Sequence, residues 1–200
     1  MTHIASERLI LASASPRRIE MFKQLDLPLE VIPSGVDERG LDGEGPAEHV
    51  RRLAANKACE VARDHPDAWV IGADTIVFID GMILGKPDTP GEARAMLERL
   101  SGREHRVFTG YRVMKKAEGR EITRVVESSV IFRVIPEDEL AWYINSNEPY
   151  DKAGGYAVQG RGAFFIREIR GSYTNVMGLP LCEVIDSLKS LGVITFPQGL

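Results

Sequence analysis

One segment near the N-terminus combines two serines, a proline and two arginines in a pattern suited to phosphate binding. Ser13-x-Ser15-Pro16-Arg17-Arg18 follows a short apolar run and precedes apolar residues at helical spacing. Serine before proline marks a helix start, and the free N–H groups and positive dipole end of a helix start favour an anion. Two guanidinium groups could grip the oxygens of that anion. The alternative is a capped helix with two solvated arginines.

A carboxylate interrupts an apolar run further along the chain, in Gly72-Ala73-Asp74-Thr75. Burying an unpaired carboxylate is costly, so Asp74 should have an arginine, a lysine or a metal as its partner. A structural salt bridge is the plainer alternative. Lys57 lies on the apolar stripe of an expected helix. It either extends its charge to solvent at the edge of that stripe or points the charge into a cleft.

A second acidic segment, Val36-Asp37-Glu38, follows an expected strand. Glu38 and Asp74 together could hold Mg²⁺ or Mn²⁺, which prefer oxygen ligands and keep several waters. Taken alone, the segment is an ordinary acidic loop. The four histidines show no HxxxH or HExxH spacing, which argues against a zinc site.

Gly85-Lys86-Pro87 is a third basic candidate. The spacing Gly81-x-x-x-Gly85-Lys86 is one residue short of a Walker A loop, and the segment lacks the serine or threonine that holds Mg²⁺. Lys86 could still reach a phosphate as a point charge. No GxSxG segment is present, so a serine hydrolase has no support.

The composition excludes several classes of protein. Hydrophobic residues make up 44% and charged residues 27% of the 200 residues, which is normal for a globular chain. The net charge of −4 disfavours a general nucleic-acid partner. No apolar run reaches the ~20 residues that span a bilayer, and no signal peptide is visible, so we expect a cytoplasmic protein without a membrane partner. The two cysteines, Cys59 and Cys182, are expected to be small core residues rather than a disulfide.

The elements that must position these residues alternate between strands and helices. Expected strands cover residues 9–12, 29–32, 68–71, 75–79, 82–84, 105–116, 121–134 and 163–169, with 72–74 interrupting one of them. Expected helices begin at Pro16 and cover 46–63, 90–100, 136–145 and 181–191. Strand–helix units mixed with hairpins predict an α/β fold with a mixed sheet and flanking helices. The chain length fits one domain over residues 1–200, or two closely packed lobes.

Taken together, the segments resemble the Maf family of nucleotide pyrophosphatases over nearly the whole chain. The motifs that carry the resemblance are Ser13-x-Ser15-Pro16-Arg17-Arg18, Val36-Asp37-Glu38, Asn56-Lys57-Ala58, Gly72-Ala73-Asp74-Thr75, Gly85-Lys86-Pro87, Leu100-Ser101-Gly102, Glu148-Pro149-x-Asp151-Lys152-Ala153-Gly154-Gly155-Tyr156, Gln159-Gly160, and Gly171-Ser172-Tyr173 with Gly178-Leu179-Pro180-Leu181. The resemblance implies hydrolysis of a nucleoside triphosphate to the monophosphate and pyrophosphate with a divalent cation, Mg²⁺ or Mn²⁺. It also implies a twisted mixed sheet in two lobes around a central cleft, as in the inosine-triphosphate pyrophosphatases.

The resemblance also assigns roles to residues. It makes Asp74 the proton acceptor, although sequence alone does not separate this role from that of a metal ligand beside Glu38. The residues expected to line the substrate site are Ser13, Arg17, Arg18, Glu38, Lys57, Lys86 and Gln159. Base choice in the family is tied to the positions of Arg17, Thr75 and Gln159, and an amide at Gln159 could read the edge of uracil or thymine.

Residues 151–160 match the branch of the family that acts on dTTP and UTP, whereas a sister branch prefers 7-methyl-GTP. An older association of the family with septum formation supplies a competing hypothesis, a non-catalytic regulator that binds nucleotide. The sequence leaves open whether the chain forms a homodimer.

Overall fold

The computed structural model describes residues 3–4 and 7–196, and the chain folds into two compact units. The first unit comprises the residues up to Asp74, Thr109–Val125, and Gly178 onward. The second comprises Thr75–Phe108 and Val126–Met177. Three long strands belong in part to each unit: β4 (Trp69–Ile79), β6 (Glu104–Lys115) and β7 (Arg120–Phe132).

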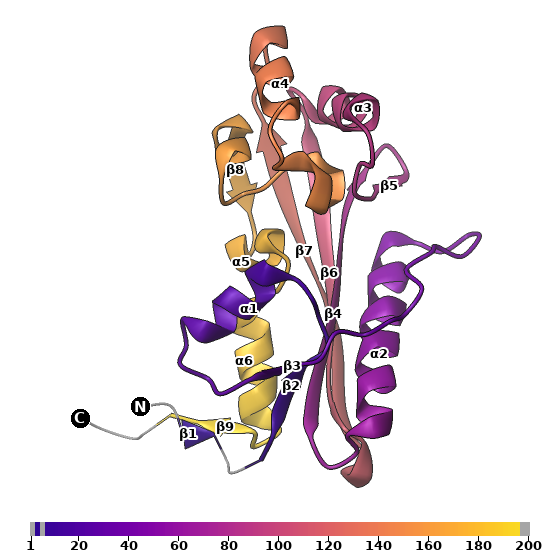
Figure 1. Ribbon diagram of the computed structural model, residues 1–200, viewed down its shortest axis with the longest axis vertical. Coiled ribbons are helices and arrows are strands. Elements are labelled where there is room, and N and C mark those ends of the chain that lie inside the picture. The colour runs from indigo at the N-terminus through magenta and orange to yellow at the C-terminus, as the bar shows by residue number, and fades with distance from the viewer. Residues whose placement is uncertain (1–2, 5–6, 197–200) are drawn as a thin grey trace. The chain divides into compact units, whose positions relative to one another are not determined.

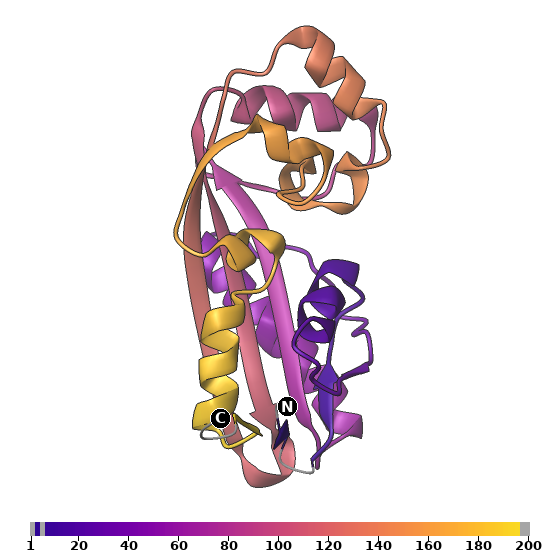
Figure 2. The ribbon, with the colours of Figure 1, turned by 90° about the vertical axis from the view of Figure 1, so that its left-hand side faces the viewer.

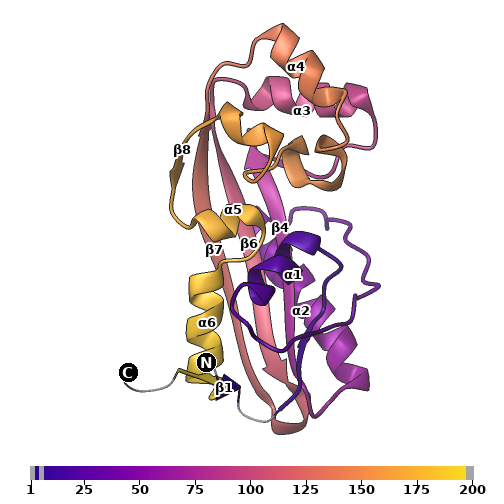
Figure 3. The ribbon, with the colours of Figure 1, turned by 60° about the vertical axis from the view of Figure 1, so that its left-hand side comes forward.

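The other described elements of the first unit are short strands, three α-helices and a 3₁₀ turn (Figure 1). They are β1 (His3–Ile4), β2 (Leu9–Leu11), α1 (Pro16–Lys23), β3 (Glu30–Val31), α2 (Pro46–Asp64), the 3₁₀ turn η1 (Lys116–Glu118), α6 (Leu181–Ser190) and β9 (Ile194–Thr195). α2 lies on one face of the strands, and α1 and α6 lie on the other (Figures 1 and 3). A buried cluster joins α2 to the strands through Ile10, Ala12, Ala58, Val61, Ala62, Ala68, Val70 and Met114.

The second unit combines helices with a series of short turns (Figure 2). It contains β5 (Met82–Leu84), α3 (Pro90–Leu100), α4 (Glu137–Ile144), the 3₁₀ turns η2 (Pro149–Asp151), η3 (Ala153–Gly155) and η4 (Arg161–Phe165), β8 (Ile166–Arg170) and α5 (Tyr173–Met177). Its core is rich in aromatic and branched aliphatic side chains, including Phe132, Tyr143, Tyr156, Phe165, Leu97 and Leu100.

The main sheet has seven strands in the order β3-β2-β4-β6-β7-β8, and β5 pairs with β4 outside this path. β2 runs parallel to both β3 and β4, whereas β5 and β8 run antiparallel to their partners β4 and β7. Parallel pairs need helical crossovers and antiparallel pairs can use tight turns, and this chain has both. The expected α/β fold with a mixed sheet and flanking helices is confirmed.

β4 is continuous from Trp69 to Ile79, so the expected interruption at residues 72–74 is wrong. Two local features allow the strand to pass through this segment. Gly72 is buried against α2, where an added Cβ would overlap the Ala54 carbonyl oxygen and would lie 2.6 Å from the Ala58 nitrogen. The absence of a side chain therefore lets α2 approach the strand closely. The charge of Asp74 is compensated by an ion pair with Lys57.

Two further expectations were wrong in detail. The strand predicted from residue 163 begins only at Ile166, because residues 161–165 form a 3₁₀ turn. Cys59 and Cys182 are exposed rather than buried. An apolar neighbourhood in the sequence does not decide which face of a helix a residue occupies. Within the described residues, every helix is too short or too polar to span a lipid bilayer.

Candidate functional site

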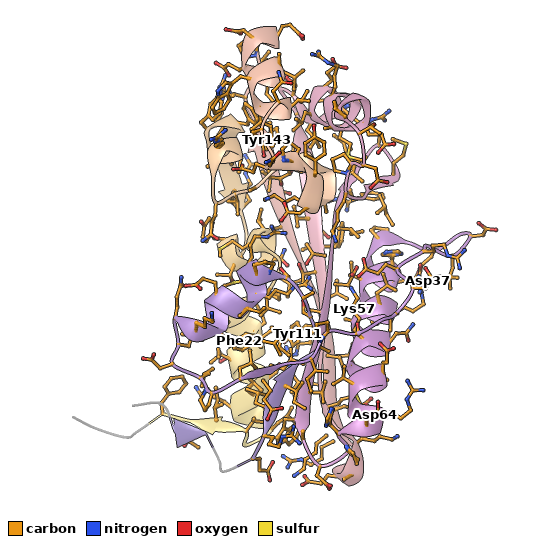
Figure 4. The ribbon with its side chains drawn as sticks, viewed as in Figure 1. Phe22, Asp37, Lys57, Asp64, Tyr111 and Tyr143 are labelled. Atoms are coloured by element: carbon orange, nitrogen blue, oxygen red, sulfur yellow. The ribbon has the colours of Figure 1, made fainter. Side chains whose placement is uncertain are left out.

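The first unit brings two of the predicted carboxylates onto one lysine. Lys57 projects from α2 (Figure 4) and is buried, with 6% of its surface exposed. Its Nζ lies 2.7 Å from Asp74 Oδ1 and 2.6 Å from Glu38 Oε1. Asp74 is also 6% exposed, while Glu38 is exposed. The buried carboxylate thus has the cationic partner that the sequence required, and Lys57 points its charge inward instead of to solvent.

Arg18 lies next to this pair and is held by main-chain oxygens. Its Nε donates to the carbonyl of Gly178 at 2.7 Å, and its Nη1 donates to the carbonyl of Ala73 at 2.9 Å. Nη1 also lies 3.2 Å from Ser13 Oγ. Because Ala73 precedes Asp74, Arg18 is fixed beside the carboxylate.

The guanidinium of Arg18 is buried, with 8% of its surface exposed. Burial lowers the pKa of Arg18, Asp74 acts to raise it, the neighbouring Arg17 lowers it further, and Glu38 raises it. Arginine stays protonated in proteins all the same. The arrangement therefore keeps a positive charge in a buried position at the start of α1.

The start of α1 has the features expected for an anion site. Ser15 is the N-cap and Pro16 opens the helix, as the sequence predicted, but the Ser15 side chain makes no capping hydrogen bond. Ser13 Oγ instead accepts from the Ser15 N–H at 3.2 Å. The first turn contains no acidic side chain, and its arginines are Arg17 and Arg18. The positive end of the helix dipole and the two arginines both favour an anion at this position.

The loop that carries Glu38 is tied to α2 by an ion-pair cluster that the sequence did not reveal. Glu44 Oε1 accepts from Arg52 Nε at 2.5 Å, and Glu44 Oε2 lies 3.0 Å from His49 Nδ1. Arg52 also donates to the carbonyl of Arg39, the residue after Glu38, at 3.1 Å. Arg52 therefore holds the loop at two points on either side of its turn, which restricts the position of Glu38.

The pKa of Glu44 predicts how the stability of this loop depends on pH. The hydrogen bond from Arg52 holds the pKa of Glu44 at about 2, below its usual 4.5. A lowered carboxylate pKa contributes stability above the unfolded value, and this contribution is lost as the pH falls through the folded value. We expect Glu44→Gln to be less stable than the wild type above pH 4.5, the usual pKa of the group, and the difference to narrow towards pH 2. Urea unfolding at several pH values measures the free energy of unfolding of both proteins. A difference between them that stays constant from pH 7 to pH 2 would contradict the prediction.

The remaining predicted residues belong to the second unit. Thr75 follows Asp74 on β4 and is partly buried, whereas Lys86 and Gln159 are exposed. The turn next to Lys86 is anchored, because the Gly154 N–H donates to the Gly85 carbonyl at 2.9 Å. This hydrogen bond joins the Gly85-Lys86-Pro87 motif to the motif that contains Gly154. The roles expected of Thr75, Lys86 and Gln159 stay predictions.

Tyr156 follows Gly154 and Gly155 in the chain and anchors this segment in the core of the second unit. Its hydroxyl lies 2.8 Å from Nε2 of the buried His105, and burial lowers the pKa of His105 to about 3. A neutral histidine and a tyrosine hydroxyl therefore anchor the segment in the core. Tyr156 was part of a motif in the sequence, but nothing local to His105 marked it as the partner.

The donor set of the first unit suits a hard divalent cation. The Asp74 and Glu38 carboxylates converge on one positive charge, the ammonium of Lys57. No group of three histidine, cysteine, aspartate or glutamate side chains comes together within residues 3–4 and 7–196. A pair of carboxylates, with waters and substrate phosphates completing the shell, is the arrangement that Mg²⁺ uses. The residues present therefore fit such a cation.

Comparison with known proteins finds sequence relatives over most of the chain. Residues 8–191 match the family described as Maf-like protein. A dTTP/UTP pyrophosphatase of Syntrophus aciditrophicus is 62% identical over 191 residues, which cover 96% of this chain and 93% of the relative. A dTTP/UTP pyrophosphatase of Geotalea uraniireducens is 47% identical over 190 residues, which cover 95% and 98%. Among solved structures, the Staphylococcus aureus Ham1 protein matches with a TM-score of 0.49 and 16% identity over 80% of each chain.

Proposed function

This chain belongs to the Maf family, and from that premise we propose that it hydrolyses dTTP and UTP to the nucleoside monophosphate and pyrophosphate. The observation that carries the proposal is the buried ion pair of Asp74 and Lys57 beside Arg18 and the start of α1. Binding a nucleotide does not require a carboxylate in the middle of an apolar strand, whereas a carboxylate held there can accept the proton of an attacking water. The relatives named dTTP/UTP pyrophosphatase support the choice of substrate.

In the proposed reaction, a water oxygen bonds to the α-phosphorus and the bond to the α–β bridging oxygen breaks. Pyrophosphate leaves with the electron pair of that bond. Asp74 accepts the proton of the attacking water, since its carboxylate is fixed by Lys57 and lies next to the carbonyl held by Arg18. A positioned general base of this kind contributes about 10²–10⁴-fold to the rate.

Glu38 and Asp74 are the residues that would hold the divalent cation. When bound, the cation would lower the pKa of its water and offset the charge that develops on the leaving group. Asp74 thus has two candidate roles, proton acceptor and metal ligand, which variants at positions 38 and 74 separate. The identity of the metal, Mg²⁺ or Mn²⁺, is part of the proposal.

The cationic groups stabilise the phosphates in this proposal. Arg17, Arg18 and Lys57 supply positive charge in the first unit, with Ser13 and the N–H groups at the start of α1 as neutral donors. Lys86 adds a point charge. Such preorganised groups act by positioning and electrostatics, which dominate catalysis of phosphoryl transfer. Thr75 and Gln159 are proposed to contact the base, and Gln159 offers both a donor and an acceptor to uracil or thymine. A cytoplasmic location, where these nucleotides are formed and used, completes the proposal.

A nucleotide panel tests the proposed function. We expect the purified protein to release pyrophosphate and the monophosphate from dTTP and UTP with Mg²⁺ or Mn²⁺, and to act far less on CTP, GTP and ATP. Preference for 7-methyl-GTP would place the chain in the sister branch. Nucleotide binding without any product would favour the non-catalytic regulator.

A further inference from the structure

We propose that Glu148 is a positioning residue that holds the segment Gly160–Gly162 and thereby fixes the neighbouring Gln159 for base selection. The proposal rests on the proposed function, in which Gln159 contacts the base. It assigns a physical role to a carboxylate that no step of the reaction uses. All the contacts involved lie within the second unit.

The Glu148 carboxylate is the acceptor for three donors. Its Oε2 accepts from the N–H of Arg161 at 2.8 Å. Its Oε1 accepts from the N–H of Gly162 at 2.8 Å and from the Tyr143 hydroxyl at 3.0 Å. Two successive main-chain N–H groups on one carboxylate fix the orientation of the peptide segment that contains them. Hydrogen bonds to an ionised acceptor are the stronger class.

Gly160 allows the chain to approach this carboxylate. It adopts a φ of +135°, and a Cβ at this position would lie 2.5 Å from Glu148 Oε2 and 2.9 Å from its Cδ. A side chain here would both strain the backbone and displace the carboxylate. The contact with Glu148 therefore explains why a glycine follows Gln159 in the sequence.

Glu148 is itself fixed from two sides. Its main-chain carbonyl accepts from Lys152 Nζ at 2.8 Å, and its N–H donates to Ser146 Oγ at 3.3 Å. The Tyr143 ring projects from α4 (Figure 4) and is fully buried, so its hydroxyl is a rigid donor. Because the carboxylate is held by groups of the core, the segment Gly160–Gly162 that it binds is held in place as well.

The charge of Glu148 is stabilised by its partners. Burial acts to raise the pKa of Glu148, but the N–H groups of Arg161 and Gly162 and the Tyr143 hydroxyl outweigh it, so the pKa lies below the usual value. The carboxylate is therefore ionised at neutral pH and accepts hydrogen bonds with both oxygens.

A fixed amide is what base selection requires. Gln159 is exposed on the segment, and a flexible glutamine could present its donor or its acceptor to any base with little preference. A site discriminates by polar contacts only when their positions are held by supporting residues. Only Gly160 separates Gln159 from Arg161, whose N–H is held by Glu148. This hydrogen bond therefore limits the positions that the side-chain amide of Gln159 reaches.

The test compares Glu148→Gln with the wild type. Glutamine has nearly the same shape but only one acceptor oxygen, so an N–H of Arg161 or Gly162 is left facing an NH₂ group. We expect the KM for UTP to rise about tenfold while kcat changes less than about threefold, the signature of lost binding rather than lost chemistry. The preference for UTP over CTP should fall by a similar factor. Glu98→Gln, an exposed substitution on α3, is the matched control.

Two readouts separate positioning from a merely structural role. Amide hydrogen exchange should become faster at Arg161 and Gly162 in Glu148→Gln. In a Gln159→Ala background the same substitution should add almost nothing to the loss of preference, because residues that act as a unit are not additive. Unchanged exchange, or two losses that multiply, would overturn the proposal. A wild-type protein that hydrolyses no nucleoside triphosphate would instead refute the proposed function.

A second variant covers the case in which Glu148→Gln fails to fold. Gly160→Ala keeps the Glu148 side chain itself, but the added Cβ would lie 2.5 Å from Glu148 Oε2 and so separates the carboxylate from the segment. The same rise in KM and the same loss of preference for UTP are expected. An alanine variant with wild-type selectivity would contradict the positioning role.

Discussion

Replacing Asp74 with asparagine should lower pyrophosphate release from UTP by about 10²–10⁴-fold, the contribution of a positioned general base. The asparagine amide oxygen can still accept the hydrogen bond that Lys57 donates at 2.7 Å. Glu38, 2.6 Å from the same ammonium, keeps that cation paired. The substitution therefore removes the proton acceptor while the fold is retained. Steady-state kinetics with a coupled pyrophosphate assay measure the loss, and circular dichroism checks the fold.

Two companion variants define what the loss means. Asp64→Asn changes an exposed carboxylate at the last residue of α2 and should retain full activity. Glu38→Gln should weaken the dependence on divalent cation more than it lowers the rate at saturating cation, if Asp74 is the base and Glu38 a ligand. If Asp74→Asn and Glu38→Gln alter the cation concentration needed for activity equally, Asp74 is a metal ligand as well. Full activity of Asp74→Asn would refute its catalytic role.

Replacing Lys57 with methionine should destabilise the folded protein by about 3–5 kcal/mol, the typical cost of removing one partner of a buried pair. Methionine fills a similar volume, so the loss would come from the charge. The Asp74 carboxylate, 6% exposed, would lose the ammonium of Lys57 at a depth where water screens the remaining charge poorly. Urea unfolding in the absence of divalent cations measures the effect.

The control for this prediction is Arg8→Met, which breaks an exposed pair with Glu30 in the same unit. Its effect should be much smaller, since exposed pairs contribute little. Mg²⁺ or Mn²⁺ should raise the melting temperature of Lys57→Met more than that of the wild type, because the ammonium then no longer competes with the cation for the two carboxylates. Asp74→Asn combined with Lys57→Met should recover part of the lost stability. A Lys57→Met protein as stable as the wild type would contradict the buried pair.

Local signals in the sequence were sufficient for most element boundaries. Pro16, Pro46 and Pro90 each stand in the first turn of the helix that the sequence placed there. Proline fixes φ and lacks an N–H, so its preference for this position is a local property. Asp80 and Gly81, both at positive φ, form the expected hairpin turn between β4 and β5. Signals of this kind depend on a few neighbouring residues and need no knowledge of the fold.

The environment of single residues could not be predicted in this way. The sequence left two interpretations for Lys57, and it placed Cys59 in the core. In the structure, Lys57 is buried with a partner and Cys59 is exposed, although both lie on α2. Which positions of the apolar stripe are covered depends on where the strands and the loop before α2 pass. That path is set by contacts distant in the sequence.

Local patterns of residues were enough to predict the longer helices and strands in their order, the mixed class of the sheet and the segments that carry polar chemistry, because each depends on residues a few positions apart. Which of these residues meet is set by the folded arrangement of the elements. Arg18 is held by the carbonyl of Gly178, 160 residues away, and Glu148 holds the N–H groups of residues 13 and 14 positions further on. Such contacts are chosen by the packing of whole elements, which brings buried charges and main-chain groups together so that each is compensated.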